Sequence, residues 1–511
     1  MKPTYYVTTP IFYVNGAPHI GHAYTMIAAD VLARFKRLDG FDVYFLTGTD
    51  EHGQKVEKAA ADAGMPAQEF TDQISASFAD VARRMNISND GFIRTTEARH
   101  KAASAALWQK LQAAGHIYLG GYEGWYAVRD EAFYDESELT TNAAGQKVAP
   151  SGAPVEFVTE PSYFFRMSAF QEKLVAHIEA NPEFIGPLAR RNEVLGFLKS
   201  PLRDLSISRT SFTWGIQVPG DDAHVMYVWL DALTNYITAV GYPDETAPLW
   251  KYWPADLHLV GKDILRFHAV IWPALLMGAD LPLPKRVFAH GWFTVEGEKM
   301  SKSVGNVIDP RDLAETFGVD ALRFFLMREI TFGSDGDYSR NSLIRRLNGE
   351  LANDLGNLAQ RTLSFIAKNA GAVVPKRGEA TEADAALAGY IADLPGQVRA
   401  FIDRQAFNDA LEAIWHAIRA GNAYIDQQAP WALRKTDTVR METVLAQLID
   451  LLRVVSTLLQ PFMPDSMSRM LDQLGVPADA RDFASLTTPI AEGTALPQPA
   501  GVFPRFVEEA A

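Results

Sequence analysis

The chain has 511 residues, of which 48% are hydrophobic and 22% charged, and its formal net charge at pH 7 is −14. This composition indicates a globular protein of about two to four domains, and the negative charge argues against bulk, non-specific binding of nucleic acid. The absence of cysteine excludes disulfides and thiolate metal sites. No apolar leader follows Met1, and polar residues interrupt the longest apolar tract, 444–463, so we expect a cytoplasmic protein that does not span a membrane.

The stretch 10–22, which reads PIFYVNGAPHIGH, lies between a predicted strand over residues 4–9 and a predicted helix over residues 22–38. His19 and His22 are therefore expected near the first turn of that helix, where free N–H groups and the positive end of the helix dipole favour phosphate. Gly21 has no Cβ and would let a ligand approach the backbone. On these residues alone, two surface histidines near a turn explain the pattern equally well.

A second strand is predicted over residues 41–46, followed by the polar loop TGTDEHG at 47–53 and a helix from about residue 54. This β-α-β-α order predicts a parallel sheet that binds ligands at the carboxyl ends of its strands. Neither a G-x-G-x-x-G after the first strand nor a G-x-x-x-x-G-K-[ST] motif is present, which disfavours a dinucleotide-binding dehydrogenase and a P-loop enzyme.

Between about residues 115 and 219 the chain is aromatic and punctuated by glycine, which predicts a β-rich insertion between two halves of the sheet. Further strands are expected at 225–232, 257–260 and 286–290, with a helix from about 264 that contains Pro273. From about residue 342 the apolar periodicity is helical, which predicts an antiparallel bundle.

The loop Lys299-Met300-Ser301-Lys302-Ser303 lies between Gly297 and Gly305. Two lysines and two hydroxyls on a mobile loop suit a triphosphate whose charge moves onto leaving pyrophosphate. Alone, the loop would be read equally well as an exposed Lys/Ser segment.

Together, the sequence HIGH after the first strand and KMSKS after the last resemble the two signatures of class I aminoacyl-tRNA synthetases. The segments 10–22, 45–53, 227–232, 261–273, 290–302 and 353–361 resemble the methionyl-tRNA synthetase family in particular, so that the resemblance covers essentially the whole chain. It implies an α/β fold, with a Rossmann-like parallel-sheet catalytic domain split by an inserted connective domain and followed by an all-α helix-bundle anticodon-binding domain. The implied boundaries are 1–115 and 225–295 for the catalytic halves, 116–224 for the insertion, 296–345 for the KMSKS and stem-contact region, and 346–511 for the bundle.

The resemblance also implies site residues. Catalysis is expected from His19, His22, Lys299 and Lys302. ATP contacts are expected from His19, Gly21, His22, Arg209, Gly261, Asp263, Met300, Ser301 and Lys302. A methionine pocket is expected from Ile11, Tyr13, Asp50, Trp229, Ala232, Leu233, Tyr236, Ile264, His268, Ile271 and Trp272. Aromatic walls suit a thioether, and Asp50 suits the substrate ammonium. Each aromatic residue, considered singly, also fits an ordinary core position.

The implied reaction activates L-methionine with ATP and Mg²⁺ to methionyl-adenylate and transfers it to the 3′ end of tRNA(Met), for translation initiation and elongation. Asn357 and Arg361, four residues apart on one helix face, and Trp431 match the family's anticodon readers, and an aromatic platform with polar edges suits unstacked bases. Without the catalytic half, a helix-surface pair and a core tryptophan would explain these three residues.

Two departures from the family pattern matter. Ala127 and Asp130 stand where many members carry zinc-knuckle cysteines, so no structural zinc is predicted. No appended oligonucleotide-binding dimerisation domain is expected, which favours a monomer. The alternatives are a cysteinyl, leucyl, isoleucyl or valyl enzyme, or a tRNA- or partner-binding protein without catalysis. The first needs thiolate zinc, the branched-chain enzymes usually need a larger editing insertion, and the intact His19, His22 and Lys302 argue against the last.

Overall fold

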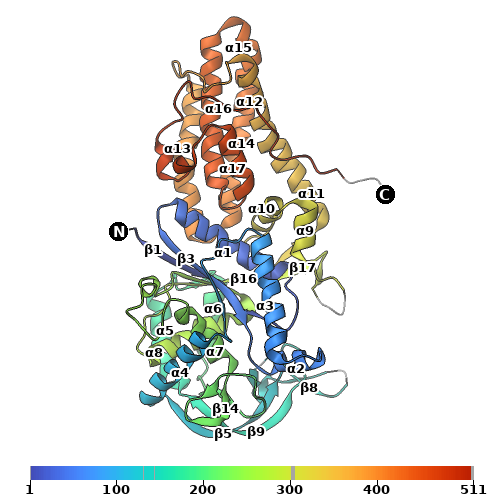
Figure 1. Ribbon diagram of the computed structural model, residues 1–511, viewed down its shortest axis with the longest axis vertical. Helices are drawn as coiled ribbons and strands as arrows, with labels where there is room; N and C mark the ends of the chain where they lie inside the picture. Colours follow the sequence, from blue (N-terminus) through green and yellow to red (C-terminus); the bar gives the residue numbers. More distant parts are fainter. Residues whose placement is uncertain (1, 131, 143, 301–304, 508–511) are drawn as a thin grey trace.

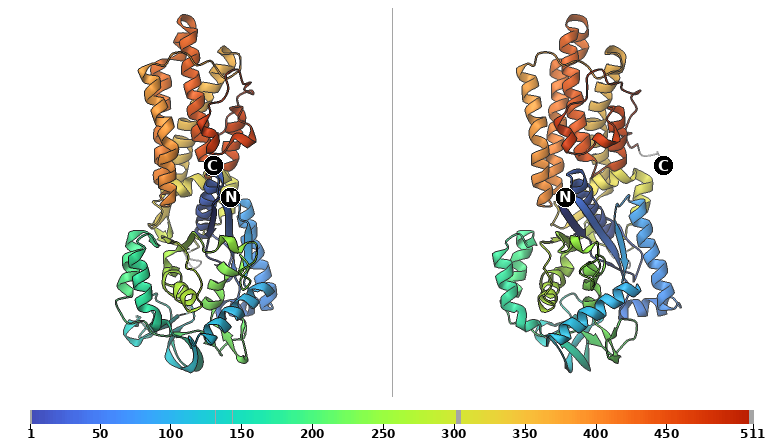
Figure 2. Two further views of the ribbon diagram at one scale, coloured as in Figure 1. Left: turned by 90° about the vertical axis from the view of Figure 1, so that its left-hand side faces the viewer. Right: turned by 60° about the vertical axis from the view of Figure 1, so that its left-hand side comes forward.

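The computed structural model describes residues 2–130, 132–142, 144–300 and 305–507. A helical bundle forms one end of the elongated molecule and a β-rich insertion forms the other, with a central sheet between them (Figure 1). Figure 2 shows the same succession from two further sides. None of the helices in the described part of the chain has the length and apolar character that crossing a bilayer requires.

The central sheet has seven strands, and every pairing in it is parallel. From edge to edge the strands are β10 (Ile185–Gly186), β16 (Val287–His290), β15 (Leu257–Gly261), β1 (Thr4–Thr8), β3 (Asp42–Asp50) and β2 (Phe12–Tyr13), with β4 (Gly91–Arg94) also paired to β3. The order reverses at β1, because β3 and β4 extend to one side of it and β15 and β16 to the other. A ligand crevice is expected at such a reversal, at the carboxyl ends of the strands.

The two faces of the sheet belong to separate hydrophobic cores, because successive side chains of a strand point to opposite faces. Val7 and Phe45 join the core that contains α1 (Ile20–Leu38) and α3 (Ala67–Arg84). Tyr6 and Leu46 join the other core. That second core includes the helices α4 (Ala98–Ala113), α7 (Val228–Thr238) and α8 (Trp272–Gly278), and α2 (Gln54–Asp62) follows β3.

The insertion contains a four-stranded antiparallel sheet and a smaller three-stranded one. The first has the order β11 (Leu205–Ser206), β9 (Glu156–Phe165), β5 (Ile117–Ala127) and β6 (Ala132–Tyr134), and the second β12 (Ser208–Arg209), β14 (Asp221–Met226) and β13 (Gln217–Val218). The pair β7 (Thr140–Thr141) and β8 (Lys147–Val148) and the helices α5 (Gln171–Ala180) and α6 (Leu188–Phe197) complete it. Since β10 lies within this span yet pairs with β16, the insertion also supplies an edge strand of the central sheet.

Two predicted elements differ from the structure. The strand expected at 225–232 is wrong, because β14 ends at Met226 and α7 begins at Val228, so that Trp229 lies on a helix. The helix expected from 264 is three segments, namely the 3₁₀ turn Lys262–Ile264, the π-helix Phe267–Ile271 and α8. Pro273 is the second residue of α8, directly after the π-helix, and proline is a recognised cause of such irregularities in a helix.

After β16 the chain forms β17 (Phe293–Val295), β18 (Glu298–Lys299), α9 (Pro310–Phe317), α10 (Val319–Glu329), β19 (Gly336–Tyr338) and α11 (Arg340–Arg346). The bundle consists of a π-helix (Leu347–Gly356), α12 (Asn357–Asn369), α13 (Glu382–Asp403), α14 (Phe407–Gln428), α15 (Pro430–Thr436), α16 (Thr438–Leu459) and α17 (Pro464–Gln473). Leu411 of α14 and Val455 of α16 are fully buried in the same core as α1. The central sheet and the bundle therefore share one continuous hydrophobic core.

Candidate active site

Two histidines cap the N-terminus of α1 through their ring nitrogens. The Gly21 N–H donates to Nδ1 of His19 and the His19 N–H donates to Nδ1 of His22, both at 3.1 Å. The two rings stack with their centroids 3.8 Å apart. Because both Nδ1 atoms accept, each ring in its neutral form carries its proton on Nε2, which is a donor suited to a phosphate oxygen. Burial, reinforced by His19, holds the pKa of His22 well below its usual range, which favours this neutral form.

The first backbone N–H groups of α1 already have acceptors. Ile20 donates to the carbonyl of Ile308 at 2.9 Å, and Gly21 donates to the His19 ring. The sequence-based expectation of free N–H groups for phosphate is therefore wrong for these two positions. The imidazole Nε2 atoms and the positive end of the helix dipole remain as the features that favour an anion here.

The space beside Gly21 is filled by the protein. A Cβ at this position would lie 3.0 Å from Cε1 of His19 and 3.8 Å from Cε of Met300. Glycine here therefore makes room for the capping ring. Met300 and the Ile308 carbonyl bring the segment around the KMSKS sequence against the start of α1. The Lys299 side chain and the whole of Ser301 and Lys302 lie outside the described residues.

The carboxyl end of β15 forms a polar corner next to α1. A Cβ on Gly261 would lie 2.6 Å from Oδ1 of Asp263, and that oxygen accepts from Nε1 of Trp292 at 3.1 Å. Nε2 of His290, at the end of β16, lies 2.8 Å from the Thr25 hydroxyl of α1. Gly261 and Asp263 thus lie at the strand-order reversal, as expected for nucleotide contacts.

The predicted methionine pocket is an aromatic cluster between α7 and the segment 264–272. Trp229 stacks on Phe267 with ring centroids 3.6 Å apart, and the indole N–H of Trp229 is buried without a hydrogen-bond partner among the described residues. Eight of the predicted apolar residues belong to or pack against one core cluster: Ile11, Tyr13, Trp229, Leu233, Tyr236, Ile264, Ile271 and Trp272. Ala232 is buried on α7. Leu233 and Trp272 are almost completely covered by protein, whereas Trp229 and Ile264 are only partly buried.

A hydrogen-bonded pair sits at the base of this cluster. The Tyr236 hydroxyl lies 2.6 Å from Nε2 of His268, and Nδ1 of His268 lies 3.0 Å from the carbonyl of Ile264. Since a carbonyl only accepts, Nδ1 carries the proton and the tyrosine donates to Nε2. Burial lowers the pKa of His268 to about 4, so the ring is neutral at physiological pH.

Asp50, at the end of β3, is a buried carboxylate with an unused acceptor. Its Oδ1 has no hydrogen-bond partner among the described residues, and the residue is 4% exposed. Burial raises the pKa of Asp50 well above its usual range, and the charges of Asp231 and Glu51 add to the effect. A buried carboxylate of this kind gains most from a cationic partner, as a substrate ammonium would be.

The sequence reasoning missed a buried cluster that joins the Asp50 loop to α7. The carboxylate of Asp231 lies 2.6 Å from Nδ1 of His52 and 2.7 Å from Nε2 of His100. Burial alone would raise the pKa of Asp231, but the two histidines outweigh it and bring the pKa down to about 2. Two features of the sequence could have indicated this cluster: an acidic residue inside the apolar run VMYVWLDAL, and a histidine two residues after Asp50.

Two cationic side chains, Lys55 and Arg209, lie close to aromatic rings. The Lys55 ammonium lies 4.8 Å from the ring centroid of Tyr13, and burial lowers its pKa to about 8 against the opposing charges of Asp130 and Asp50. Arg209 is 2% exposed and its guanidinium lies 4.5 Å from the ring of Tyr227, directly before α7. The predicted ATP-binding Arg209 is thus largely covered by protein.

The predicted knuckle positions form a small apolar core. Ala127, Ala149 and Ala153 are almost fully buried together, and Asp130 accepts hydrogen bonds from the hydroxyls of Tyr134 and Ser151. Alanine methyl groups cannot ligate a metal, and among the described residues no cluster of three His, Cys, Asp or Glu side chains is arranged to do so. These residues do not suit a zinc ion. Apolar packing and polar contacts hold this part of the insertion together instead.

The three predicted anticodon readers lie on neighbouring helices of the bundle. Trp431 is 44% exposed on α15, and the guanidinium of Arg361 on α12 lies 5.4 Å from its ring centroid. Arg361 is also paired with Asp426 at 2.5 Å. Asn357 is exposed one turn earlier on α12. The patch lies at the end of the bundle remote from the sheet, where Figure 1 places α15.

Comparisons with known proteins agree along the whole chain. The family described as tRNA synthetases class I (M) matches residues 5–363, and the family described as the anticodon binding domain of methionyl tRNA ligase matches residues 374–511. The methionine–tRNA ligase of Mesorhizobium japonicum is 57% identical over 510 residues, with 99% of each chain covered. The methionine–tRNA ligase of Brucella suis is 57% identical over 508 residues, again with 99% of each chain covered.

A solved structure is similar in both sequence and fold. It is that of Mycobacterium tuberculosis methionyl-tRNA synthetase in complex with methionyl-adenylate, at 53% identity and a TM-score of 0.97. The similarity covers 99% of this chain and 100% of that one.

Proposed function

Because this chain belongs to the methionyl-tRNA synthetase family of class I tRNA synthetases, we propose that it activates L-methionine with ATP and transfers the methionyl group to tRNA(Met). The observation that supports this most directly is the meeting of three features at the strand-order reversal. These are the histidine pair at the start of α1, the buried carboxylate of Asp50, and the aromatic cluster around Trp229.

In the first step the carboxylate of methionine attacks the α-phosphorus of ATP in line, and the bond to pyrophosphate breaks. We propose that Asp50 pairs with the ammonium group while Tyr13, Trp229 and their neighbours surround the thioether. The Nε2–H groups of His19 and His22 would donate to phosphate oxygens as charge accumulates there. Lys299 and Lys302 would hold the leaving pyrophosphate, with Mg²⁺ entering as part of the ATP substrate.

In the second step a hydroxyl of the terminal ribose of the tRNA attacks the methionyl carbonyl and AMP leaves. This step needs the tRNA's 3′ end at the sheet while its anticodon loop meets Asn357, Arg361 and Trp431 on the bundle. A single chain carries both contact regions, so we propose that the protein acts as a monomer. We place its reaction in the cytoplasm, with protein synthesis.

Methionine-dependent ATP–pyrophosphate exchange, followed by charging of tRNA(Met), tests the proposal. We expect exchange with methionine and charging of tRNA(Met) by the same preparation. Folded protein without exchange would contradict an enzymatic function. Exchange driven best by cysteine, leucine, isoleucine or valine would contradict the choice of methionine.

A further inference from the structure

We propose that Arg323 is a positioning residue for tRNA charging, because it fixes the orientation of the helical bundle relative to α1, the helix that carries His19 and His22. This inference rests on the proposed function and concerns the tRNA step alone.

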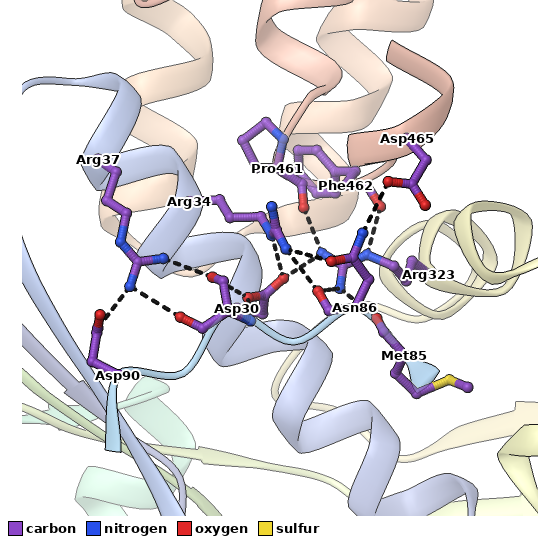
Figure 3. Close-up of polar contacts among 11 residues, drawn as sticks. Asp30, Arg34, Arg37, Met85, Asn86, Asp90, Arg323, Pro461, Phe462 and Asp465 are labelled. Atoms are coloured by element: carbon purple, nitrogen blue, oxygen red, sulfur yellow. Dashed lines mark hydrogen bonds and ion pairs between the residues drawn. The ribbon is translucent and has the colours of Figure 1, made fainter. Parts of the chain in front are cut away.

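Arg323 joins four segments that are distant in sequence (Figure 3). It lies on α10 and is fully buried, as is its partner Asp30 on α1. Its guanidinium donates to Oδ2 of Asp30 at 2.6 Å and to the carbonyl of Pro461 at 2.7 Å. It also donates to the carbonyls of Phe462 at 3.0 Å and Met85 at 3.1 Å.

The carbonyl partners of Arg323 explain why an arginine suits this position. Met85 is the residue directly after α3, and Pro461 and Phe462 lie in the short connection between α16 and α17. Buried backbone carbonyls at such positions need hydrogen-bond donors from elsewhere, and a cation with several donors supplies them. The planar guanidinium can serve all three partner segments at once, whereas a lysine ammonium has only three donors on one nitrogen.

Asp30 carries the junction into α1 and the sheet. Its Oδ1 accepts from both the N–H and the hydroxyl of Ser88 at 2.6 Å, just before β4. Arg34 donates to Asp30 at 2.7 Å and to the carbonyl of Asn86 at 2.7 Å, and the Asn86 amide reaches Asp465 of α17 at 3.1 Å. The bundle, α10, α1 and the sheet edge therefore meet in one polar network within the shared apolar core.

Other ion pairs between the bundle and α1 lie nearer the surface. Arg399 of α13 pairs with Asp39 at 2.7 Å with 42% of its side chain exposed, and Lys36 pairs with Asp403, whose side chain is 48% exposed. Exposed pairs contribute little to stability, so they bridge the same elements without fixing them. Arg399 is for this reason a matched control for Arg323.

The functional consequence follows from geometry. In the proposed function a tRNA touches the patch around Trp431 on α15 and the central sheet at the same time. Figure 1 shows α15 and the central sheet on opposite sides of α10, the helix that carries Arg323. A small tilt at the junction produces a larger displacement at α15, and simultaneous engagement of two sites is lost when their spacing is wrong. Adenylate formation needs only the catalytic half and is insensitive to such a tilt.

The test compares Arg323→Lys with Arg399→Ala in the full-length protein. For Arg323→Lys we expect kcat/KM for charging tRNA(Met) to fall about tenfold, while methionine-dependent exchange stays within about twofold of the unmodified protein. For Arg399→Ala we expect both activities to be unchanged. For a tRNA with an altered anticodon, kcat/KM for charging should fall less from the unmodified protein to Arg323→Lys, because such a tRNA already engages the bundle poorly.

A purely structural role of Arg323 predicts other results. Charging and exchange would then fall together with the melting temperature, and the loss would be the same for both tRNAs; either result would overturn the proposal, as would unchanged charging by folded Arg323→Lys. If Arg323→Lys does not fold, Asp30→Asn tests the same junction by the same two measurements, namely charging and exchange relative to the unmodified protein. Failure of the unmodified protein to charge tRNA(Met) would instead reject the proposed function.

Discussion

The proposed amino-acid site and the proposed anticodon patch are built in opposite ways. At the sheet, Asp50, Asp231 and His52 are polar side chains buried beneath the surface, and burial and neighbouring charges shift the pKa values of the two carboxyl groups. On the bundle, Trp431 and Arg361 are partly exposed side chains on helices whose buried faces are apolar. Binding at the first site would thus depend on buried polar groups, and binding at the second on side chains exposed to solvent.

This difference predicts which activity a substitution at each site should change. A small ammonium ion gains its selectivity from a carboxylate withdrawn from water, since competing hydration is then absent. An unstacked base needs an accessible ring face and a cation beside it. Substitutions at the sheet should therefore change methionine activation, and substitutions on the bundle should change charging alone.

The largest effect is expected for Asp50→Asn. The amide keeps the shape but removes the charge opposite the ammonium, so kcat/KM for methionine in the exchange reaction should fall about 100-fold, or ~3 kcal/mol. KM for ATP should change little. Asp62→Asn, at an exposed position at the end of α2, is the control and should have no effect. An equal loss in KM for methionine and for ATP would show that Asp50 is not the ammonium partner.

The second effect should appear only in charging. Trp431→Ala removes the aromatic platform, and kcat/KM for tRNA(Met) should fall about 20-fold, or ~2 kcal/mol, with exchange unchanged. Tyr390→Ala is the matched control, because Tyr390 is a similarly exposed aromatic residue of the bundle, on α13, at 47%. Equal losses for the two variants would indicate that Trp431 reads no base.

The bundle was predictable from sequence because its signal is local. Apolar residues at helical spacing, such as Leu411, Ile414 and Ile418, mark the buried face of a helix without knowledge of its neighbours. The predicted strand at 225–232 failed for a related reason. A short apolar run fits a buried helix as well as a strand, and here the packing of α7 on α4 decides.

In the candidate active site, the sequence indicated only the residues that a motif carries. His19 and His22 are neighbours in sequence, but their mutual capping depends on ring orientations that no spacing rule gives. The cluster of His52, His100 and Asp231 spans residues 52–231, so its members meet only once the sheet has formed. Long-range polar contacts of this kind leave little periodic trace in the chain.

The cluster around Asp231 is expected to act through Asp50. Asp231→Asn would weaken the link between the Asp50 loop and α7, and KM for methionine should rise about fivefold with a smaller change in kcat. The decisive measurement is a double-mutant cycle. In the Asp50→Asn background the Asp231→Asn change should add almost nothing to KM, whereas additive effects would show that Asp231 acts independently of Asp50.

The smallest effect is a pH dependence that only the buried site should show. The pKa of Asp50 is raised by burial and by the charges of Asp231 and Glu51, so as the pH falls its carboxylate becomes protonated earlier than an ordinary aspartate. Protonated Asp50 cannot pair with an ammonium, and KM for methionine should rise several-fold on the acid side and level off above it. Asp231, with its pKa near 2, stays charged throughout, and His22 stays neutral.

Lys55 sets the upper limit of that experiment, because its pKa of about 8 places its own titration there. Below that pH, changes in KM for methionine should therefore report Asp50, and Asp50→Asn should give a flat profile. KM for tRNA(Met), measured over the same range, should be flat in both proteins, since the indole of Trp431 does not titrate. A pH-dependent KM for methionine that survives in Asp50→Asn would assign the titration to another group and remove the main evidence that the buried carboxylate binds the ammonium.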